Sequence, residues 1–271
     1  MRHKLVSIIM PVHNAGKFVR HAILSVLNQS YPNWELLIIN DGSTDDSVYQ
    51  VKRFEDDRII FFNQKHKGVS AARNVGLTRM KGEYFCFLDA DDVLPPRSLK
   101  ARLSCFAENI GFVDGAVDTF DHVMQHKHDR WTPRAEGKVL SKLFRLSDAC
   151  FFGLTWMVRR QPHLRYHFDE SLGHCEDLLF FMSIADSGRY AFTEETILYY
   201  RKNPKSAMSN LRGLASGYTA LRYRIRELFP DKLSFFDKFV YDYKVRRIML
   251  LSFLRKSQYR EATLYLTYGR L

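Results

Sequence analysis

The sequence predicts an α/β protein built on a mostly parallel sheet, and two observations support that prediction. Between residues 5 and 88, short apolar runs alternate with segments of helical periodicity. Repeated strand–helix units of this kind form parallel sheets with right-handed crossovers. The last apolar run, Phe85–Leu88, leads directly into the carboxylates of Asp89, Asp91 and Asp92. Open α/β sheets bind ligands at the carboxyl ends of their strands, so these acids mark the first candidate site.

The first half of the chain is expected to contain four strands and three helical segments. The expected strands are residues 6–10, 34–39, 59–62 and 85–88, and the expected helical segments are residues 15–27, 44–54 and 69–80. The strand runs are short and strongly apolar, as in strands that are buried on both faces.

The second half is less regular. We expect a helix from Pro95-Pro96 to about residue 108, a strand at 112–120, a polar loop at 121–138, a helix at 139–146, a strand at 151–158, a helix from Glu176 to about Gly188 and a strand at 196–198. A basic loop follows to about residue 210, and residues 211–271 have the pattern of helices with aromatic and aliphatic side chains on one side and Lys or Arg on the other.

The composition excludes several classes of protein. With 271 residues and 46% apolar side chains, the chain has the composition of an ordinary globular protein. Its apolar runs are shorter than the roughly 18 residues that a membrane span requires. Arg2-His3-Lys4 and the apolar run after it resemble a signal peptide but lack a small-residue cleavage site, so we expect a first strand there.

The cysteines and histidines favour neither a disulfide framework nor a zinc site. The four cysteines (Cys86, Cys105, Cys150 and Cys175) are widely spaced without a CxxC pair, which fits a reducing cytosol. His122, His126 and His128 lie near two aspartates, but their spacing matches no known ligand pattern. A polar surface loop is therefore favoured over a metal site there.

The net charge of +11 is concentrated at the C-terminal end. Residues 211–271 contain 13 Lys and Arg against 5 Asp and Glu, a net charge of +8. Two interpretations stay open for this region: a helical cap on the core with a solvated basic face, or an amphipathic surface that binds an anionic membrane. No nucleic-acid-binding motif accompanies the charge, so no nucleic-acid partner is expected.

Polar residues follow each of the first four strands. His13 and Asn14 follow the first, Asp41 the second, residues 65–67 the third and the acidic cluster the fourth. Because the carboxyl ends of parallel strands share one edge of the sheet, these groups suit a nucleotide laid across it. Asp41 alone is not decisive, because Asp-Gly-Ser-Thr-Asp is equally an ordinary turn into a helix N-cap.

Two further stretches supply candidate residues. The small-residue segment Gly68–Gly76 places Arg73 one turn into a helix that faces the acidic cluster, where a guanidinium would bind a diphosphate or a carboxylate. The alternative is a solvated Arg whose stem packs on the sheet. Glu176 and Asp177 lie in the first turn of their helix, where acids commonly stabilise the helix dipole. Alternatively, Asp177 takes a proton from a bound hydroxyl.

Taken in order, these motifs resemble the family 2 glycosyltransferases of the GT-A fold, over roughly residues 4–210. The motifs are IMPVHN at 9–14, NDGS at 40–43, GVSAARN at 68–74, LDADD at 88–92 and CED at 175–177. The resemblance implies transfer of a sugar, with inversion at the anomeric carbon, from a nucleoside diphosphate sugar to an acceptor hydroxyl. It also implies a UDP-sugar as the donor and Mn²⁺ or Mg²⁺ as the cofactor.

The same resemblance implies a role for each motif. Asp177 would be the catalytic base, Asp91 would bind the metal ion, and Asp89 would contact the metal ion or the ribose. The remaining substrate-binding residues would be Pro11, Val12, His13, Asn14, Asp41, Arg73, Ala90, Glu176 and Arg201, with Asp41 on the base. Two positions depart from the family pattern: His13 stands where a tyrosine is common, and Asn203 stands where many members have a histidine.

The implied chemistry is consistent with these residue types. A metal ion on the diphosphate stabilises the leaving group, and a carboxylate base activates the acceptor hydroxyl. We expect residues 1–95 to bind the nucleotide sugar, residues 96–210 to bind the acceptor, and residues 211–271 to form a basic helical region. The acceptor would be a glycan or glycolipid of surface-polysaccharide, lipopolysaccharide or lipid-linked glycan synthesis. The expected location is the cytoplasm, with a peripheral position on the cytoplasmic face of the membrane left open.

Two other functions stay open. A nucleotidyltransferase also uses an α/β sheet with metal-binding carboxylates, but the chain lacks a Gly-rich loop with Arg or Lys after its first strand. A non-catalytic subunit of a glycan-assembly complex would bind nucleotide or membrane only. The presence of Asp89, Asp91 and Asp177 argues against that function.

Overall fold

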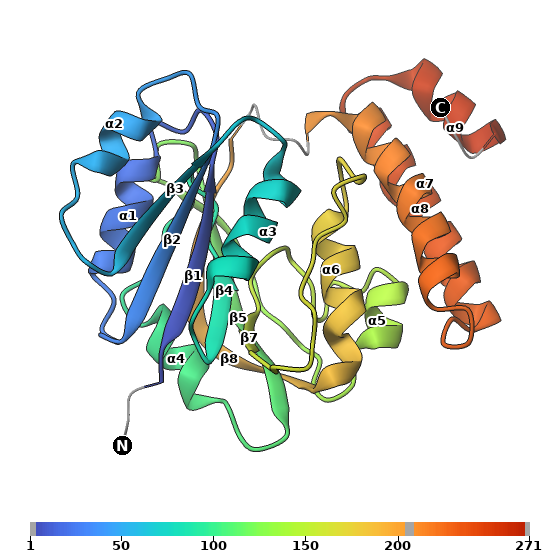
Figure 1. Cartoon of the computed structure of the whole chain (residues 1–271). Helices are drawn as coiled ribbons and strands as arrows, with labels where there is room; N and C mark the ends of the chain where they lie inside the picture. The colour runs from blue at the N-terminus through green and yellow to red at the C-terminus, as the bar shows by residue number, and fades with distance from the viewer. Residues whose placement is uncertain (1–3, 204–208, 269–271) are drawn as a thin grey trace.

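A single mixed sheet of eight strands organises the molecule. The structure is a computed structural model that describes residues 4–203 and 209–268 (Figure 1). The strands are β1 (Val6–Val12), β2 (Trp34–Asp41), β3 (Ile59–Gln64), β4 (Tyr84–Phe87), β5 (Ile110–Phe120), β6 (Lys127–Trp131), β7 (Met157–Arg159) and β8 (Arg189–Arg201). Their order is β3-β2-β1-β4-β7-β5-β6, and β8 pairs with β5. The predicted α/β class is confirmed.

Helices cover both faces of this sheet. They are α1 (Val19–Leu27), α2 (Ser47–Lys52), α3 (Val69–Arg79), α4 (Ser98–Ser104), α5 (Leu140–Phe144), α6 (Glu176–Ile184), the 3₁₀ helix η1 (Ala185–Ser187), α7 (Leu211–Leu228), α8 (Phe235–Arg255) and α9 (Tyr259–Tyr268). In Figure 1, α1 and α2 lie on one side of β1–β3, and the C-terminal helices lie at the opposite side of the molecule.

Alternating residues of the strands feed two separate apolar cores. Ile8 and Met10 of β1 belong to the core under α1, whereas Ile9 belongs to the larger core that includes α3, α5 and α6. This alternation explains why the strand sequences are apolar throughout, since a sheet covered on both faces offers no solvated side. The four parallel-paired strands β3-β2-β1-β4 therefore match the predicted strands closely.

Three predictions about the second half differ from the structure, two as errors and one in length, and each difference has a physical cause. The polar loop at 121–138 contains β6, an edge strand whose side chains are mostly exposed, so it lacks an apolar pattern. The strand predicted at 196–198 lies within the 13-residue β8 and is too short, because the middle of β8 is polar and partly exposed. The strand predicted at 151–158 shrinks to β7, because most of that run is irregular chain whose aromatic residues pack on the core.

The C-terminal helices are part of the main core. Leu214 and Leu221 of α7 and Met249 and Phe253 of α8 are buried in the same cluster as α6. The capping box of Ser234 with Asp237 fixes the start of α8. Among the described residues, no helix combines the length and the apolar character that a membrane span requires.

Candidate functional site

The carboxyl ends of β1, β2, β3 and β4 meet at one edge of the sheet and carry most of the predicted site residues. The parallel register pairs Val12 of β1 with Asn40 of β2, and Asp41 of β2 with Gln64 of β3. The side chains of Pro11 and Val12 are buried in this edge. These two residues therefore offer a ligand mainly their backbone.

Asp41 is buried and its carboxylate is fully engaged within the chain. It accepts hydrogen bonds from Gln64 Nε2 (2.7 Å) and from the backbone amides of Lys67 (2.8 Å) and Gly68 (2.9 Å). Gly68 has a φ of 95°, a conformation that favours glycine and lets its amide turn towards Asp41. Burial alone would raise the pKa of Asp41, but these hydrogen bonds outweigh it and lower the pKa.

Two histidines stack beside Asp41. The rings of His13 and His66 lie 4.2 Å apart, centroid to centroid, with an interplanar angle of 25°. His13 Nδ1 lies 2.7 Å from the carbonyl oxygen of Asp41, and His66 Nδ1 lies 2.8 Å from its carboxylate. Since both acceptors belong to Asp41, each neutral ring holds its proton on Nδ1. Asp41 thus orients both rings at the exposed end of the site.

Asn14 holds the loop that follows β2. Its φ is 51°, and its side-chain carbonyl accepts a hydrogen bond from the amide of Thr44 (2.8 Å). The backbone amide of Asn14 in turn donates to Ser43 Oγ (3.0 Å). The predicted substrate contact of Asn14 stays a prediction, while its observed contacts join the loops after β1 and β2.

Arg73 is the centre of the acidic end of the site. Its guanidinium is almost completely buried, and it donates to Asp89 Oδ1 (3.1 Å) and to Glu176 Oε1 (2.9 Å). It also lies 5.4 Å from the centre of the Phe168 ring. One buried cation therefore joins two acids that are far apart in the sequence, and Arg73 is not the solvated side chain of the alternative interpretation.

Asp177 lies next to this ion pair at the start of α6. Cys175, the N-cap residue just before α6, has a φ of 63°, an uncommon conformation for a residue other than glycine. Burial and the charge of Glu176 raise the pKa of Asp177 to about 7, although the nearby Arg73 opposes the shift. A carboxylate with such a pKa is suited to exchange protons near neutral pH.

The other acids of the β4 loop have different surroundings. Asp92 is buried and accepts a hydrogen bond from the backbone amide of Arg201 (2.8 Å). Asp91 is partly buried, and burial together with the charge of Asp89 raises its pKa. Ala90, between them, is buried. Asp92 therefore fastens β8 to this loop, while Asp89 and Asp91 remain the acids with accessible surface.

Arg201 serves the architecture of this loop. Its Nε donates to the carbonyl oxygen of Asp91 (2.6 Å), and its guanidinium lies 4.7 Å from the centre of the Phe18 ring. The side chain is nearly fully buried. Any contact of Arg201 with substrate stays a prediction, and residues 204–208 of the predicted basic loop lie outside the described residues.

The described residues offer two kinds of metal ligands. Asp89 and Asp91 present carboxylate oxygens, which suit Mg²⁺ or Mn²⁺. A cation would also relieve the repulsion that raises the pKa of Asp91, so these residues fit the ion that the family resemblance implies. His13, Asp41 and His66 form the single three-residue ligand group found among the described residues. The histidines of the 122–128 segment form no such group in the described part, and His126 Nδ1 lies 2.9 Å from Asp121.

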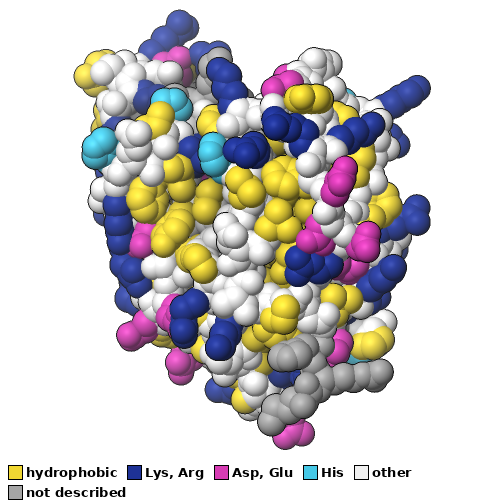
Figure 2. Space-filling view, turned by 90° about the vertical axis from the view of Figure 1, so that its left-hand side faces the viewer, with side chains coloured by type: hydrophobic (Ala, Val, Ile, Leu, Met, Phe, Trp, Pro, Cys, Tyr) yellow, Lys and Arg dark blue, Asp and Glu magenta, His cyan; other side chains and the backbone are white. Residues whose placement is uncertain are grey.

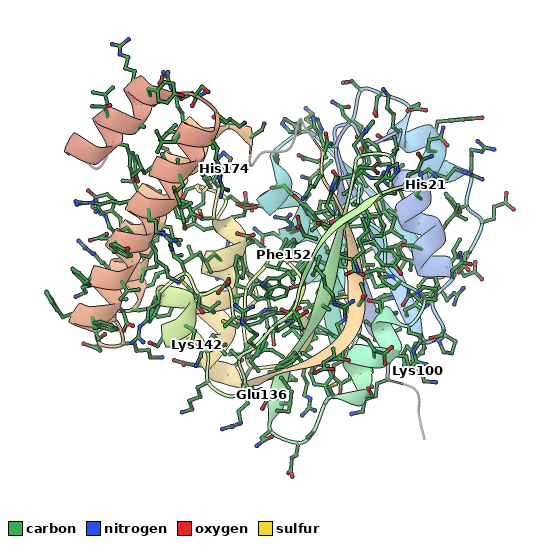
Figure 3. All side chains as sticks on the ribbon, turned by 180° about the vertical axis from the view of Figure 1, so that it is seen from behind. His21, Lys100, Glu136, Lys142, Phe152 and His174 are labelled. Carbon is green, nitrogen blue, oxygen red and sulfur yellow. The ribbon has the colours of Figure 1, made fainter. Side chains whose placement is uncertain are left out.

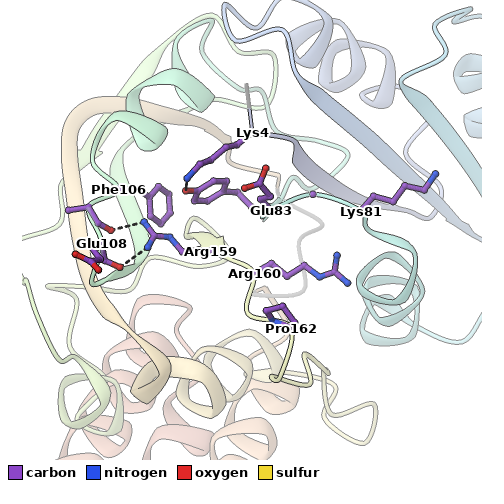
Figure 4. A pocket seen from close by; sticks show the side chains of 11 residues that line it. Lys4, Lys81, Glu83, Phe106, Glu108, Arg159, Arg160 and Pro162 are labelled. Carbon is purple, nitrogen blue, oxygen red and sulfur yellow. Dashed lines mark hydrogen bonds between the residues drawn. The ribbon is translucent and has the colours of Figure 1, made fainter. Parts of the chain in front are cut away.

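A separate pocket of about 610 Å³ lies at the opposite, amino-terminal edge of the sheet (Figure 4). Tyr84 and Phe106 form its aromatic part, and Lys4 lies 3.1 Å from the Tyr84 hydroxyl. Arg159 is held by the carbonyl oxygens of Ala107 (2.6 Å) and Glu108 (2.7 Å). None of the predicted site residues lines this pocket, so it is not the site that the motifs describe.

Sequence reasoning missed several residues that build the site. Asn74 exchanges two hydrogen bonds with the backbone of Phe168 (2.7 and 3.0 Å), which fixes the ring beside Arg73. His174 packs against Gly217 of α7, where an added Cβ would lie 2.5 Å from the His174 Cβ. Figure 3 shows His174 between the C-terminal helices and the rest of the molecule. No local pattern marks these contacts, because each joins distant parts of the chain.

A family model described as glycosyl transferase family 2 matches residues 7–166. The chain is 42% identical over 120 residues to the Escherichia coli UDP-Glc:alpha-D-GlcNAc-diphosphoundecaprenol beta-1,3-glucosyltransferase WfgD, covering 44% of this chain and 47% of WfgD. It is 44% identical over 112 residues to an uncharacterized glycosyltransferase of Haemophilus influenzae, covering 40% of this chain and 45% of that protein. The matches thus span less than half the length of these relatives.

Two solved structures share the fold at low sequence identity. The structure of Staphylococcus aureus TarS residues 1–349 with UDP-GlcNAc has a TM-score of 0.68 at 18% identity, covering 92% of this chain and 72% of that one. The mannosyltransferase PcManGT of Pyrobaculum calidifontis, solved with GDP-Man and Mn²⁺, has a TM-score of 0.65 at 16% identity, covering all of this chain and 77% of that one. Both similarities support the GT-A architecture.

Proposed function

Since the chain belongs to glycosyl transferase family 2, whose model matches residues 7–166, we propose that it transfers a sugar from a nucleoside diphosphate sugar to an acceptor hydroxyl with inversion. The observation that carries the proposal is the bridge from Asp89 through Arg73 to Glu176. The bridge brings the start of α6, with Asp177, to the acidic end of the strand edge. The departing diphosphate needs groups that bind a metal ion, and the incoming hydroxyl needs a base. Asp89 and Asp91 supply the first and Asp177 supplies the second.

The donor is a UDP-sugar in this proposal. Its base lies at the end of the edge formed by Asp41 and the stacked His13 and His66, and its diphosphate extends towards Asp89 and Asp91. TarS has been solved with UDP and with UDP-GlcNAc, which supports the choice of base. Because the Asp41 carboxylate already has three donors within the chain, we assign it to orienting the histidines, which in turn stack on the base.

Asp91, with Asp89, would hold Mn²⁺ or Mg²⁺ through carboxylate oxygens. The ion would neutralise the negative charge that develops on the departing nucleoside diphosphate. The presence of Mn²⁺ in the PcManGT structure supports this assignment. Arg73 keeps Asp89 in place, and the bond from Asp92 to the Arg201 amide fixes the loop that carries both acids.

Asp177 acts as the catalytic base. Its raised pKa, about 7, leaves a substantial ionised fraction at neutral pH together with enough basicity to accept the hydroxyl proton. Glu176 is fixed by its ion pair with Arg73, so it holds α6 in position. Any contact of Glu176 with the sugar is made while this ion pair is in place. The proton passes from the acceptor oxygen to the Asp177 carboxylate as the new glycosidic bond forms and the bond to the diphosphate breaks.

The acceptor is a lipid-linked glycan in this proposal. WfgD, as its name states, acts on a diphosphoundecaprenol-linked sugar, and this similarity supports the choice of acceptor. The four cysteines are free, which supports a reducing compartment. We therefore place the protein in the cytoplasm, at the cytoplasmic face of the membrane that carries such acceptors.

A screen of nucleotide sugars for hydrolysis, with Mn²⁺, Mg²⁺ or a chelator, tests the proposal. We expect hydrolysis of at least one UDP-sugar that is lost with the chelator. Asp91→Asn should lower the rate by at least about 100-fold, since a metal ion on the leaving group contributes several kcal/mol. Asp231→Asn, which changes an exposed acid between α7 and α8, is the matched control and should retain the activity of the unaltered protein.

The competing function is a non-catalytic nucleotide-binding subunit. It predicts that UDP binds to the purified protein and that no nucleotide sugar is hydrolysed under any metal condition. Binding of no nucleoside diphosphate at all, with either metal ion, would contradict both functions.

A further inference from the structure

Helix α8 combines a buried apolar stripe with large apolar side chains that are exposed. Tyr241, Val245, Met249 and Phe253 recur every four residues and are buried against the core. Six further large side chains of the helix remain exposed: Phe235 (84%), Phe236 (57%), Phe239 (61%), Tyr243 (60%), Leu251 (40%) and Leu254 (41%). We call these six residues the outer face of α8. A helix with one solvated side ordinarily has polar residues there, so these exposed apolar side chains indicate an interaction surface.

The charges around the outer face are almost all positive. Helix α8 contains five Lys and Arg and two Asp. Both acids are neutralised by other parts of the chain: Asp237 pairs with Arg145 (2.6 Å), and Asp242 pairs with Arg222 (3.4 Å). Arg246 and Arg247 are exposed and form no ion pair with a described residue. The surface that remains combines aromatic side chains with unpaired cations.

We propose that the outer face of α8 binds the surface of an anionic lipid bilayer. Phe and Tyr side chains insert at the boundary between headgroups and acyl chains, while Arg246 and Arg247 remain at the level of the anionic headgroups. A second copy of the chain fits less well. A symmetric contact through this face would set the arginines of one copy close to those of the other, and their repulsion would oppose it.

The position of α8 in the fold is compatible with this role. Figure 1 and Figure 3 show the C-terminal helices along one side of the molecule, away from the strands of the sheet. Figure 2 shows the opposite side, around α1 and α2, where basic and acidic side chains are interspersed with apolar ones. Helix α7 packs against α8 and contacts His174 just before α6. The inference rests on the proposed function for its purpose, which is to hold the enzyme where a lipid-linked acceptor resides.

Vesicle co-sedimentation of the full chain tests the inference. The probes are vesicles of two parts phosphatidylcholine to one part phosphatidylglycerol and vesicles of phosphatidylcholine alone. We expect binding to the anionic vesicles that weakens as salt is added. Arg246→Gln with Arg247→Gln should weaken this binding roughly 30-fold at low salt, because each cation near such a surface contributes about a fivefold effect. Phe235→Ser with Phe239→Ser should weaken it at least about tenfold.

Matched controls distinguish binding by the outer face of α8 from non-specific adsorption of the protein to vesicles. Arg20→Gln with Lys52→Gln removes two exposed cations from α1 and α2, and Tyr49→Ser removes an exposed aromatic side chain (65%) from α2. These controls should bind vesicles like the unaltered chain, and all variants should unfold at the same temperature. Equal weakening by the controls would overturn the inference. Concentration-dependent self-association that Phe235→Ser with Phe239→Ser abolishes would also overturn it, in favour of a second copy.

Hydrolysis of the donor in solution distinguishes this inference from the proposed function. The outer-face variants should hydrolyse a soluble UDP-sugar at the rate of the unaltered chain, because none of the altered residues lies at the site. If no nucleotide sugar is hydrolysed while salt-sensitive vesicle binding persists, the proposed function is wrong and membrane binding by the outer face of α8 is supported. If hydrolysis is intact and vesicle binding is absent, only the proposal that the outer face of α8 binds a membrane is wrong.

Discussion

At the scale of single residues, the site depends on one buried guanidinium shared by two acids. Arg73 donates to Asp89 and Glu176, and its charge also lowers the cost of ionising Asp177. Breaking a buried ion pair by removing one partner leaves an uncompensated charge, so Arg73, Asp89 and Glu176 form one electrostatic unit. The proposed base, Asp177, is therefore tested most directly by a change that keeps both of these ion pairs.

Asp177→Asn is such a change, since it removes the base but keeps the shape and the Arg73 pairs. We expect turnover to fall by about 100-fold or more, because general base catalysis contributes about 10² to 10⁴. Donor affinity should change less than about twofold, since the donor is bound before the base acts. The control is Asp186→Asn, which alters an exposed acid of η1 that pairs with Lys232, just beyond the other end of α6. Full turnover in Asp177→Asn would exclude Asp177 as the base.

The pH dependence of the reaction follows from the same carboxylate. The base works only when ionised, and burial raises the pKa of Asp177 to about 7. Activity should therefore rise with pH and level off above about 7. Glu176→Gln removes the negative charge next to Asp177, so the pKa should fall and the acidic limb should move to lower pH. Profiles of kcat/KM against pH check this, and an acidic limb that Glu176→Gln leaves in place would contradict it.

At the scale of elements, the chain just before α6 packs closely against α7, in addition to the ion pair that joins Glu176 of α6 to Arg73. A Cβ on Gly217 would lie 2.5 Å from the His174 Cβ and 3.1 Å from its carbonyl oxygen. At Gly213, one turn earlier, a Cβ would meet the Nε2 end of the same side chain at 2.5 Å, which can rotate away, and the Asn210 side chain at 2.6 Å. A substitution at Gly217 would therefore displace the backbone of His174, whereas one at Gly213 would displace mainly its side chain.

Gly217→Ala should destabilise the protein by about 1–3 kcal/mol and lower turnover, because the crowded backbone of His174 shifts α6 and Asp177. Gly213→Ala should cost less, since a flexible ring yields and alanine favours the helix by about 1 kcal/mol. Urea unfolding gives the stabilities, and donor hydrolysis gives the turnover. Equal effects of the two substitutions on both quantities would show that the contact with His174 does not position α6.

At the scale of the whole molecule, the sequence predicts what is buried and misses what is exposed. The strands β1 to β4 were predictable because both their faces are covered, which leaves a continuous apolar run in each. Strand β6 and the middle of β8 were not, because an edge strand with solvated side chains has no such run. The strand-end residues His13, Asp41 and Asp89 were placed by the same logic, since parallel strands bring their ends together.

The long-range partners of the site needed the three-dimensional structure. Nothing near Arg73 in the sequence identifies Glu176 as its partner, 103 residues away. The engagement of Asp41 with Gln64 and two backbone amides was likewise hidden, because an aspartate in a turn has the same sequence signature whichever group it binds. Sequence patterns report local periodicity, whereas these pairs depend on how the sheet and the helices are packed.

The C-terminal region is packed on the core, as the first of the two interpretations left open by the sequence expects, and this determines how it responds to removal. Leu211, Leu214, Leu221 and Ile225 of α7 are buried in the main core together with α6, so the region is a packed cap as well as a basic surface. Each buried leucine contributes about 2–5 kcal/mol, and four such residues equal or exceed the roughly 5–15 kcal/mol by which a domain is stable.

A chain ending at Asn210 should therefore lack cooperative unfolding and should aggregate, rather than behave as a soluble catalytic core that no longer binds membranes. Circular dichroism during heating checks this, with the variant Phe235→Ser and Phe239→Ser as the matched comparison, because it alters the outer face of α8 and leaves the core intact. A truncated chain that unfolds cooperatively and still hydrolyses a nucleotide sugar would show that α7 and α8 are an accessory to the fold.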